Sequence, residues 1–515
     1  MSTATSSTEP GRRPRREGLV RPLRDVAALL AFRRGTGGRR QRVAAALVVA
    51  SLPAAAVVPA LTPDAGGTGR AFNLLVLLPT AMAALVVITA VSAIAGGGGR
   101  ELLAREPAQV FPVSPTVDHL GALLLAPLTI AWMVQAWVLL GAGAYAVGPR
   151  PVPLLGLQLG LALWLLLATA VGQALAWTVE AVRRRPRGLL LVRGVAAVLV
   201  VAALAAQAAH RLVPLLDAVP TSWLLVGLLG APGPRWGLTL AGLAVVTVGA
   251  VLLGAVPARR AARLLPIDEV AAETGHRRAR PLPRSAARAL VRGDRASVWR
   301  AVPMRRGLLV LALGPGLVAV LGDLPWSSLT LLPGLVISGG ALLFGVNAWC
   351  LDGGGGRWRE SLPVPPQTVF RARVQVLAEF LLAAGVLTVL VAGARAGVPR
   401  PAEASALVAS LLVVLVQVTG ASMRWSQQHP YAVDLRSARA TPAPPTAMVG
   451  YSARLALATT VTGLVFSGLA QIDDWRIAPL LAVPMLAWSA VRLLRTRERW
   501  CDPVRRSAVV LAVTA

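Results

Sequence analysis

The sequence predicts an all-α, polytopic membrane protein with about twelve transmembrane helices in two parallel six-helix repeats. Three observations predict it: long apolar runs throughout the chain, a basic charge concentrated in alternate connections between them, and one loop sequence that occurs twice. The 515-residue chain is 55% hydrophobic, with a mean hydropathy of +0.64. Runs of this length satisfy their backbone in lipid as helices, and they are too long for barrel strands.

The apolar runs give the order of the predicted spans. Six fall in the first half, near residues 43–61, 73–95, 119–147, 152–181, 189–209 and 236–256, and six in the second, near 307–321, 329–350, 372–394, 403–423, 449–469 and 477–494. The run at 307–321 is short and contains Gly314, Pro315 and Gly316. We therefore expect a kinked span there, or one that its flanking residues extend.

These runs divide the chain into five segments: residues 1–42, a basic region with an interfacial helix; 43–256, the first membrane half; 257–306, a basic linker with a second interfacial helix; 307–494, the second half; and 495–515, a C-terminal tail. Arg21–Arg34 and Arg288–Arg306 each interleave apolar residues with arginine, which is typical of helices at a membrane surface. Plain topogenic charge would also explain either piece alone, but one before each half favours interfacial helices.

The formal net charge of +29 would indicate a nucleic-acid partner in a soluble chain. Here the arginines cluster in connections such as Arg183–Arg187 and Arg424–Arg439, all on one predicted side, whereas a connection on the other side contains Asp473 and Asp474. This is the positive-inside pattern. It predicts a multi-pass protein of the plasma membrane with both termini cytoplasmic and no nucleic-acid partner.

The residue inventory indicates neither an enzyme nor a cofactor or metal protein. Cys350 and Cys501 are the only cysteines, and His119 and His210 lie at predicted span ends without a second ligand at metal spacing. The chain also contains no lysine, so it cannot form the P-loop that binds the phosphates of ATP.

The duplicated loop follows the second predicted span of each half. GGGGRELLAREPAQVFPVSP spans Gly96–Pro115, and GGGGRWRESLPVPP spans Gly353–Pro366. A short amphipathic helix suits the first copy, and Ser114 is placed to begin the next span. Tight turns in a Gly- and Pro-rich chain would explain one copy, but two copies in register favour docking segments. The candidate docking residues are Arg100, Glu101, Arg105, Glu106 and Phe111 in the first copy and Arg357, Trp358, Arg359 and Glu360 in the second.

Polar residues inside predicted spans form a second set of candidates, because they are costly in lipid and face a bundle interior or a cavity. The set comprises Gln135, Gln173, Gln375, Glu379 and Gln417. The glutamines suit hydrogen bonds between helices better than a transport pathway. Glu379 leaves two roles open, proton coupling or pairing with an arginine such as Arg371 or Arg373, and pairing is favoured.

The layout resembles the membrane subunits of ABC-2-type ABC transporters, in a fused form with two permease halves. In that family an interfacial elbow helix opens each half, and the loop after the second span carries a coupling helix that docks on an ATP-binding subunit. The resemblance implies coupling segments at Arg100–Phe111 and Arg357–Leu362 and elbows at Arg21–Arg34 and Arg288–Arg306. NAWCLDGG at Asn347–Gly354 also resembles such permeases.

The same resemblance implies a transport function with a separate P-loop ATP-binding subunit as partner. Family members often have a re-entrant region before their sixth span. His210–Trp236 is similar in position, whereas the second half has only Ala470–Trp475 there. This departure argues against symmetric gating.

Two other functions fit parts of the sequence. A secondary transporter of major facilitator type also has twelve spans in two halves, but the duplicated loop lacks the basic signature of that family and only Glu379 offers a coupling acid. A membrane-embedded enzyme such as a lipid transferase ranks last, because neither Asp217 nor the Asp473-Asp474 pair has a neighbouring histidine.

Overall fold

The computed structural model describes residues 24–28, 46, 50–95, 114–128, 130–264, 281, 283–322, 324–433 and 442–514. Within those ranges every regular element is a helix, and ten helices are long and apolar enough to cross a membrane. The all-α class and the multi-pass membrane character are therefore confirmed. Two shorter apolar helices, Ala50–Leu61 and Trp132–Val147, lie within the first and third predicted runs.

The first half is built around one long central helix. Its elements are η1 (Val58–Leu61), α3 (Arg70–Ala95), α5 (Pro115–Leu125), η2 (Ala126–Leu128), α6 (Ile130–Val147), α7 (Pro151–Arg183), α8 (Gly188–Ala208), α9 (Leu212–Asp217), α10 (Thr221–Leu229) and α11 (Pro234–Ala262). Helix α7 packs against α3, α6 and α11. Leu157, Leu161 and Trp164 of α7 are buried in this core, which explains why α7 is the most enclosed span of this half.

The second half is built around α19. Its elements are α13 (Ala286–Arg300), α14 (Val302–Leu321), α15 (Trp326–Leu329), α16 (Leu332–Leu343), η3 (Gly345–Asp352), α17 (Gly355–Glu360), α18 (Pro366–Gly393), α19 (Pro401–Gln428), α20 (Pro445–Leu469), α21 (Ile477–Cys501) and α22 (Pro503–Thr514). Helix α19 packs against α16, α20 and α21, and its Val414, Val418 and Met423 are fully buried.

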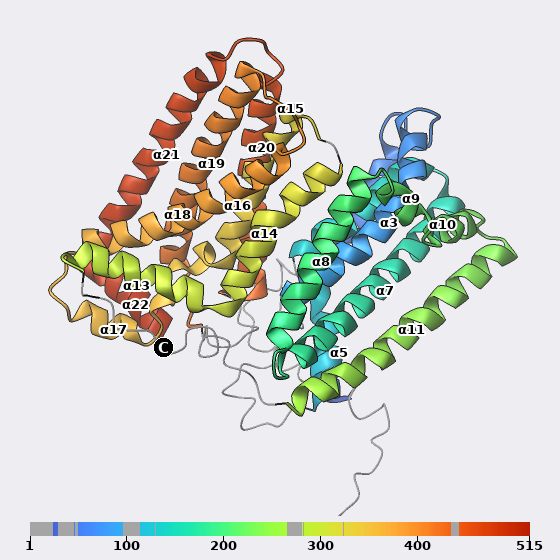
Figure 1. Cartoon of the computed structure of the whole chain (residues 1–515), viewed down its shortest axis with the longest axis horizontal. Helices are drawn as coiled ribbons and strands as arrows, with labels where there is room; N and C mark the ends of the chain where they lie inside the picture. Colours follow the sequence, from blue (N-terminus) through green and yellow to red (C-terminus); the bar gives the residue numbers. More distant parts are fainter. Residues whose placement is uncertain are drawn as a thin grey trace, which may run out of the picture.

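The two groups of helices lie side by side in Figure 1. Helix α3 of the first half contacts α14 of the second. The end of α8 also reaches across, because Gln207 Nε2 donates a hydrogen bond to the Leu321 carbonyl over 2.9 Å. The junction between the halves therefore involves α3, α8 and α14.

Helix α13 covers most of the segment in which the sequence predicts the second interfacial helix. It runs crosswise at the foot of the second half in Figure 1 and buries Val291, Asp294 and Val298 against it. The prediction placed residues 288–306 in this helix, but the chain turns at Ala301 and residues from Val302 onward belong to α14. The short run at 307–321 is thus extended by its flank. Of the first predicted interfacial helix only residues 24–28 are described, and they are helical.

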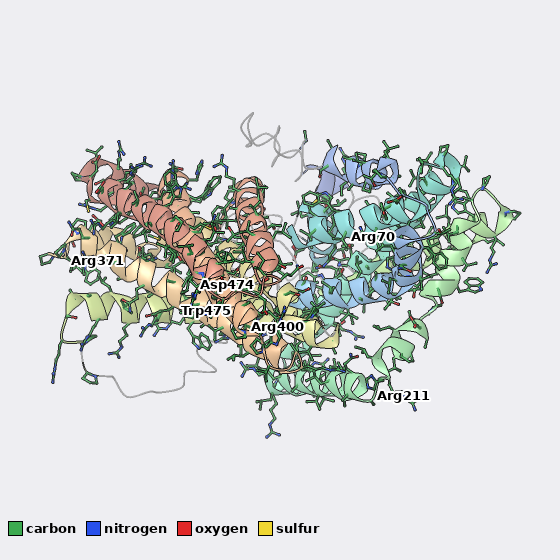
Figure 2. The ribbon with its side chains drawn as sticks, turned by 90° about the horizontal axis from the view of Figure 1, so that it is seen from above. Arg70, Arg211, Arg371, Arg400, Asp474 and Trp475 are labelled. Carbon is green, nitrogen blue, oxygen red and sulfur yellow. The ribbon has the colours of Figure 1, made fainter. Side chains whose placement is uncertain are left out.

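The region between α8 and α11 is longer than its counterpart in the second half. It forms α9 and α10, which pack against α3, and Thr80 donates a hydrogen bond to Asp217 over 2.9 Å. In the second half a short turn at residues 470–476 connects α20 to α21. Figure 2 looks onto this end of the molecule and labels Asp474 and Trp475 in the turn. The difference in length noted in the sequence is therefore a difference in helical structure.

Helix α5 begins where the sequence predicts. Ser114 is its N-cap residue, and the Ser114 hydroxyl accepts a hydrogen bond from the Val117 amide over 3.3 Å, with Pro115 in the first turn. We expect Ser114→Ala to lower the free energy of unfolding by about 1 kcal/mol, because one amide of the first turn loses its acceptor. Thermal unfolding of the detergent-solubilised protein measures this. Ser507→Ala, an exposed position inside α22, is the control and should leave the midpoint unchanged. Equal midpoints for both variants would contradict the capping role.

Candidate functional site

The end of the second half formed by α13, η3, α17 and α22, here called the basic end, contains the second copy of the duplicated loop. Helix α16 ends at Leu343, and the 3₁₀ segment η3 follows it. Inside η3 the chain breaks at Asn347, whose φ of −144° and ψ of 66° are not helical. Gly353 follows with φ +47°, a conformation that favours glycine, and turns the chain into α17.

Asn347 holds the break in place. Its side-chain Nδ2 donates hydrogen bonds to the Tyr431 carbonyl over 2.7 Å and to the Pro442 carbonyl over 3.0 Å. These carbonyls lie after α19 and before α20. One buried amide therefore connects the end of the second span to the fourth and fifth predicted spans of this half.

A buried ionic cluster lies beside this break. Arg373 of α18 is 1% exposed, and its Nε lies 2.9 Å from an Asp294 oxygen of α13. Its Nη2 lies 2.7 Å from Asp352 Oδ1, and its Nη1 donates to the Ala348 carbonyl. The second Asp352 oxygen pairs with Arg359 of α17. Through two arginines and two aspartates, α13, η3, α17 and α18 are joined in one network.

This network combines two opposing electrostatic effects. Burial raises the pKa of the Asp294 carboxyl, whereas the neighbouring Arg373 guanidinium lowers it. Removing charges from water is costly, so such a cluster is tolerated only when each charge has close partners. Loss of one member would leave the others buried without compensation.

Two tryptophans form the apolar side of the cluster. Trp349 of η3 and Trp500 of α21 stack with their ring centroids 3.5 Å apart and their planes 3° from parallel. The guanidinium carbons of Arg373 and Arg359 lie 5.3 and 5.8 Å from the Trp349 ring centroid. These distances allow cation–π attraction, which is stronger away from water. The stack thereby connects the ionic cluster to α21.

Helix α22 lies against α17. Arg506 of α22 pairs with Glu360 over 2.8 Å, and Arg357 donates from Nε to Thr514 Oγ1 over 2.9 Å. A side chain at Gly356 would lie only 3.1 Å from Thr514 Cγ2, so glycine permits the close approach. Val509, Val510 and Val513 of α22 are buried. The segment expected as a tail therefore includes a packed helix.

The structure describes only one of the two sets of candidate docking residues. Arg100, Glu101, Arg105, Glu106 and Phe111 lie outside the described residues. The second set, Arg357, Trp358, Arg359 and Glu360, is brought together on α17. Within it, Arg359 is 8% exposed and belongs to the ionic cluster, whereas Trp358 is 69% exposed. Arg359 thus anchors α17, and Trp358 is the large apolar side chain that α17 presents outward.

The polar residues of the spans lie in several separate helix pairs. Gln135 of α6 accepts a hydrogen bond from Thr89 of α3 over 3.0 Å, and Gln417 of α19 accepts one from Thr462 of α20 over 3.2 Å. Gln173 of α7 is 4% exposed. These contacts join neighbouring helices, as expected of glutamines in helix packing.

Glu379 pairs with an arginine, but with a different one from those considered in the sequence. Its two oxygens accept hydrogen bonds from Arg295 of α13 over 2.8 and 2.7 Å, and Gln375 Nε2 donates to the same carboxylate over 2.8 Å. Arg373 is unavailable to it because Asp294 and Asp352 already bind that guanidinium. The sequence could not predict Arg295, because only the crossing of α13 over α18 brings it near.

Sequence reasoning did not single out several members of the basic end as a site. They are Asp294, Trp349, Asp352, Arg373, Trp500 and Arg506. Two signals were present. The NAWCLDGG run contains Trp349 and Asp352, and the spacing of Val509, Val510 and Val513 is that of an amphipathic helix.

The arrangement suits mechanical coupling and docking. In the described ranges, no three histidine, cysteine or acidic side chains gather as a metal site. His119 is buried, and its Nε2 lies 3.0 Å from the Val251 carbonyl within the first half. Comparison of the chain with known protein families, curated proteins and solved structures gives no match.

Proposed function

We propose that the chain is the membrane-spanning permease of an ABC-type exporter that works with a separate ATP-binding subunit. In this proposal the two halves are parallel six-helix repeats, twelve spans in all, in the plasma membrane. The basic end faces the cytoplasm, with both termini on that side.

The packing of the two halves supports the repeat. In the first half α3 contacts α6, α6 contacts α7, and α7 contacts α8 and α11. In the second, α16 contacts α18, α18 contacts α19, and α19 contacts α20 and α21. The same order of neighbours is expected when two repeats share one fold, and an even number of spans gives them the same orientation.

One observation carries the proposal. Helix α17 is a short helix in the loop after the second span, and ion pairs connect it to the spans. Arg359 of α17 binds Asp352, and Asp352 binds Arg373 of α18, which also binds Asp294 of α13. A displacement of α17 would therefore be transmitted through these ion pairs to the span α18 and to the crosswise helix α13. A docking helix that transmits ATPase closure needs such a connection.

A secondary transporter of major facilitator type is the alternative. It would need a carboxylate that gains and loses a proton during transport. Glu379, the obvious acid, is bound by Arg295 and Gln375, which favours a packing role. Transport by the purified chain in a proton gradient without an ATPase would favour the alternative.

Replacing Trp358 with alanine is expected to weaken binding of the ATP-binding subunit about 30-fold, because an exposed aromatic anchor at an interface is worth about 2 kcal/mol or more. The measurement is co-purification of the chain with its proposed P-loop ATP-binding subunit, followed by titration of the two. The ATPase activity of the complex is a second readout.

Trp475→Ala is the matched control. Trp475 is 54% exposed and lies in the turn between α20 and α21, at the opposite end of the second half. It should leave binding unchanged. Equal binding by both variants and the wild type would reject α17 as the docking helix.

A further inference from the structure

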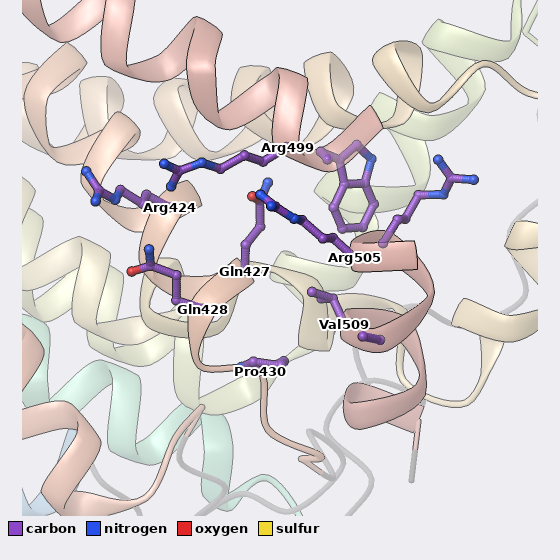
Figure 3. A pocket seen from close by; sticks show the side chains of 10 residues that line it. Arg424, Gln427, Gln428, Pro430, Arg499, Arg505 and Val509 are labelled. Carbon is purple, nitrogen blue, oxygen red and sulfur yellow. The ribbon is translucent and has the colours of Figure 1, made fainter. Parts of the chain in front are cut away.

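A cavity of about 380 Å³ opens between the ends of α19, α21 and α22, separate from α17. Arg424 of α19, Arg499 of α21 and Arg505 of α22 line it. Figure 3 shows Arg499 and Arg505 reaching toward Gln427, with Arg424 beside them on α19. Each guanidinium comes from a different helix, so the fold itself gathers them.

Among the described residues, little negative charge compensates the arginines of the cavity. Neither Arg424 nor Arg499 makes a hydrogen bond or ion pair with another described residue. Arg505 contacts Asp502 over 3.3 Å, but these side chains are 65% and 41% exposed, so that pair is weak. Arg506 is occupied by Glu360. Like charges held close together repel one another, and an anion in the cavity would relieve that repulsion.

The depth of the cavity matches the headgroup region of a bilayer. Arg424 directly follows the apolar run of α19, and Arg499 lies five residues beyond the apolar run of α21. That is about 7.5 Å along a helix, comparable with the thickness of one headgroup layer. Helix α22 carries exposed Val504 and Leu511 beside its arginines, as helices at a membrane surface do.

We propose that this cavity binds the phosphate headgroup of an anionic phospholipid of the inner leaflet. Basic pockets between spans on the cytoplasmic side suit such headgroups, because several arginines bind one phosphate and the acyl chains stay in lipid. The buried Trp500 forms one wall. A lipid bound there contacts α19, α21 and α22 together. It thereby stabilises the packing of α22 against α17. The inner-leaflet assignment rests on the proposed topology.

The test compares the full chain with two double variants by native mass spectrometry in detergent. Arg424→Gln/Arg499→Gln removes the two unpaired arginines of the cavity. Arg371→Gln/Arg497→Gln makes the same change of charge at positions that do not line it. The probes are phosphatidylglycerol, phosphatidylcholine of the same chain length, and inorganic phosphate.

We expect the cavity variant to bind phosphatidylglycerol about 30-fold more weakly than the wild type, since each of the two arginines near the surface contributes about fivefold. The control variant should bind it as the wild type does, and phosphatidylcholine should not compete. Equal loss in both variants, or equal binding of both lipids, would overturn the proposal. Displacement of the lipid by millimolar phosphate would show that the cavity binds free phosphate, and it would overturn the assignment of a lipid as the ligand.

Two further measurements separate failure of this site from other failures. Thermal unfolding of the cavity variant without added lipid should match the wild type, which shows that it folds. Binding of the ATP-binding subunit reports on the proposed function independently. A negative lipid result with intact ATPase binding therefore counts against the cavity alone.

Discussion

Arg373→Ala is expected to lower the free energy of unfolding by about 3–5 kcal/mol, because it breaks a buried ionic cluster by removing one partner. Arg373 is 1% exposed and binds both Asp294 and Asp352. Without it, the buried Asp294 and the partly buried Asp352 would lie near each other with Arg359 alone to balance them. Denaturant unfolding of the detergent-solubilised protein, followed by circular dichroism, measures the loss.

Arg371→Ala is the control for that experiment. Arg371 lies two residues away on the same helix and is exposed, so its loss should change stability by about 0.5 kcal/mol or less. Arg373→Lys keeps the charge but lacks the planar fork that serves two carboxylates and a carbonyl, so an intermediate loss is expected. A loss as small for Arg373→Ala as for Arg371→Ala would contradict the role of the cluster.

Trp349→Ala is expected to cost a similar amount, about 3–5 kcal/mol, because it removes a large buried side chain and leaves a cavity. Trp349 is 2% exposed and stacks on Trp500. The change would also remove the ring over which Arg359 and Arg373 lie. Unfolding experiments measure the loss, and near-ultraviolet circular dichroism reports the stacked pair directly.

Trp488→Ala provides the comparison for Trp349→Ala. Trp488 is on α21, as is Trp500, but it is 65% exposed. Its replacement should leave both the stacking signal and the unfolding midpoint close to those of the wild type. Loss of the stacking signal in Trp488→Ala, or its persistence in Trp349→Ala, would show that the stack is not formed by Trp349 and Trp500.

Much of the helical architecture was predictable because long apolar runs have one solution in lipid. The predicted runs at 152–181, 236–256 and 403–423 fall within α7, α11 and α19. Local chemistry also sufficed at Ser114, where a capping hydroxyl and a following proline begin α5. These features depend on residues that are close together in the sequence, so one sequence is enough to predict them.

The basic end was harder to predict because its contacts join distant residues. Asp294 and Arg373 are separated by about eighty positions, and Glu360 and Arg506 by 146. The sequence around one residue of each ion pair does not indicate which distant residue is its partner. The break at Asn347 was also hidden, because the run at 329–350 is apolar throughout and is typical of one continuous helix. Long-range partners decide such features.

Asn347 has a consequence for how this chain tolerates chemical change. The sequence contains only two asparagines, and this one donates both amide hydrogens to carbonyls beyond the ends of α19 and α20. Aspartate has nearly the same shape but would direct a carboxylate at two oxygens. Slow deamidation of this single residue would therefore replace two hydrogen bonds with repulsion between a carboxylate and two carbonyl oxygens. During storage of the purified protein, this change would weaken the packing of three spans at once.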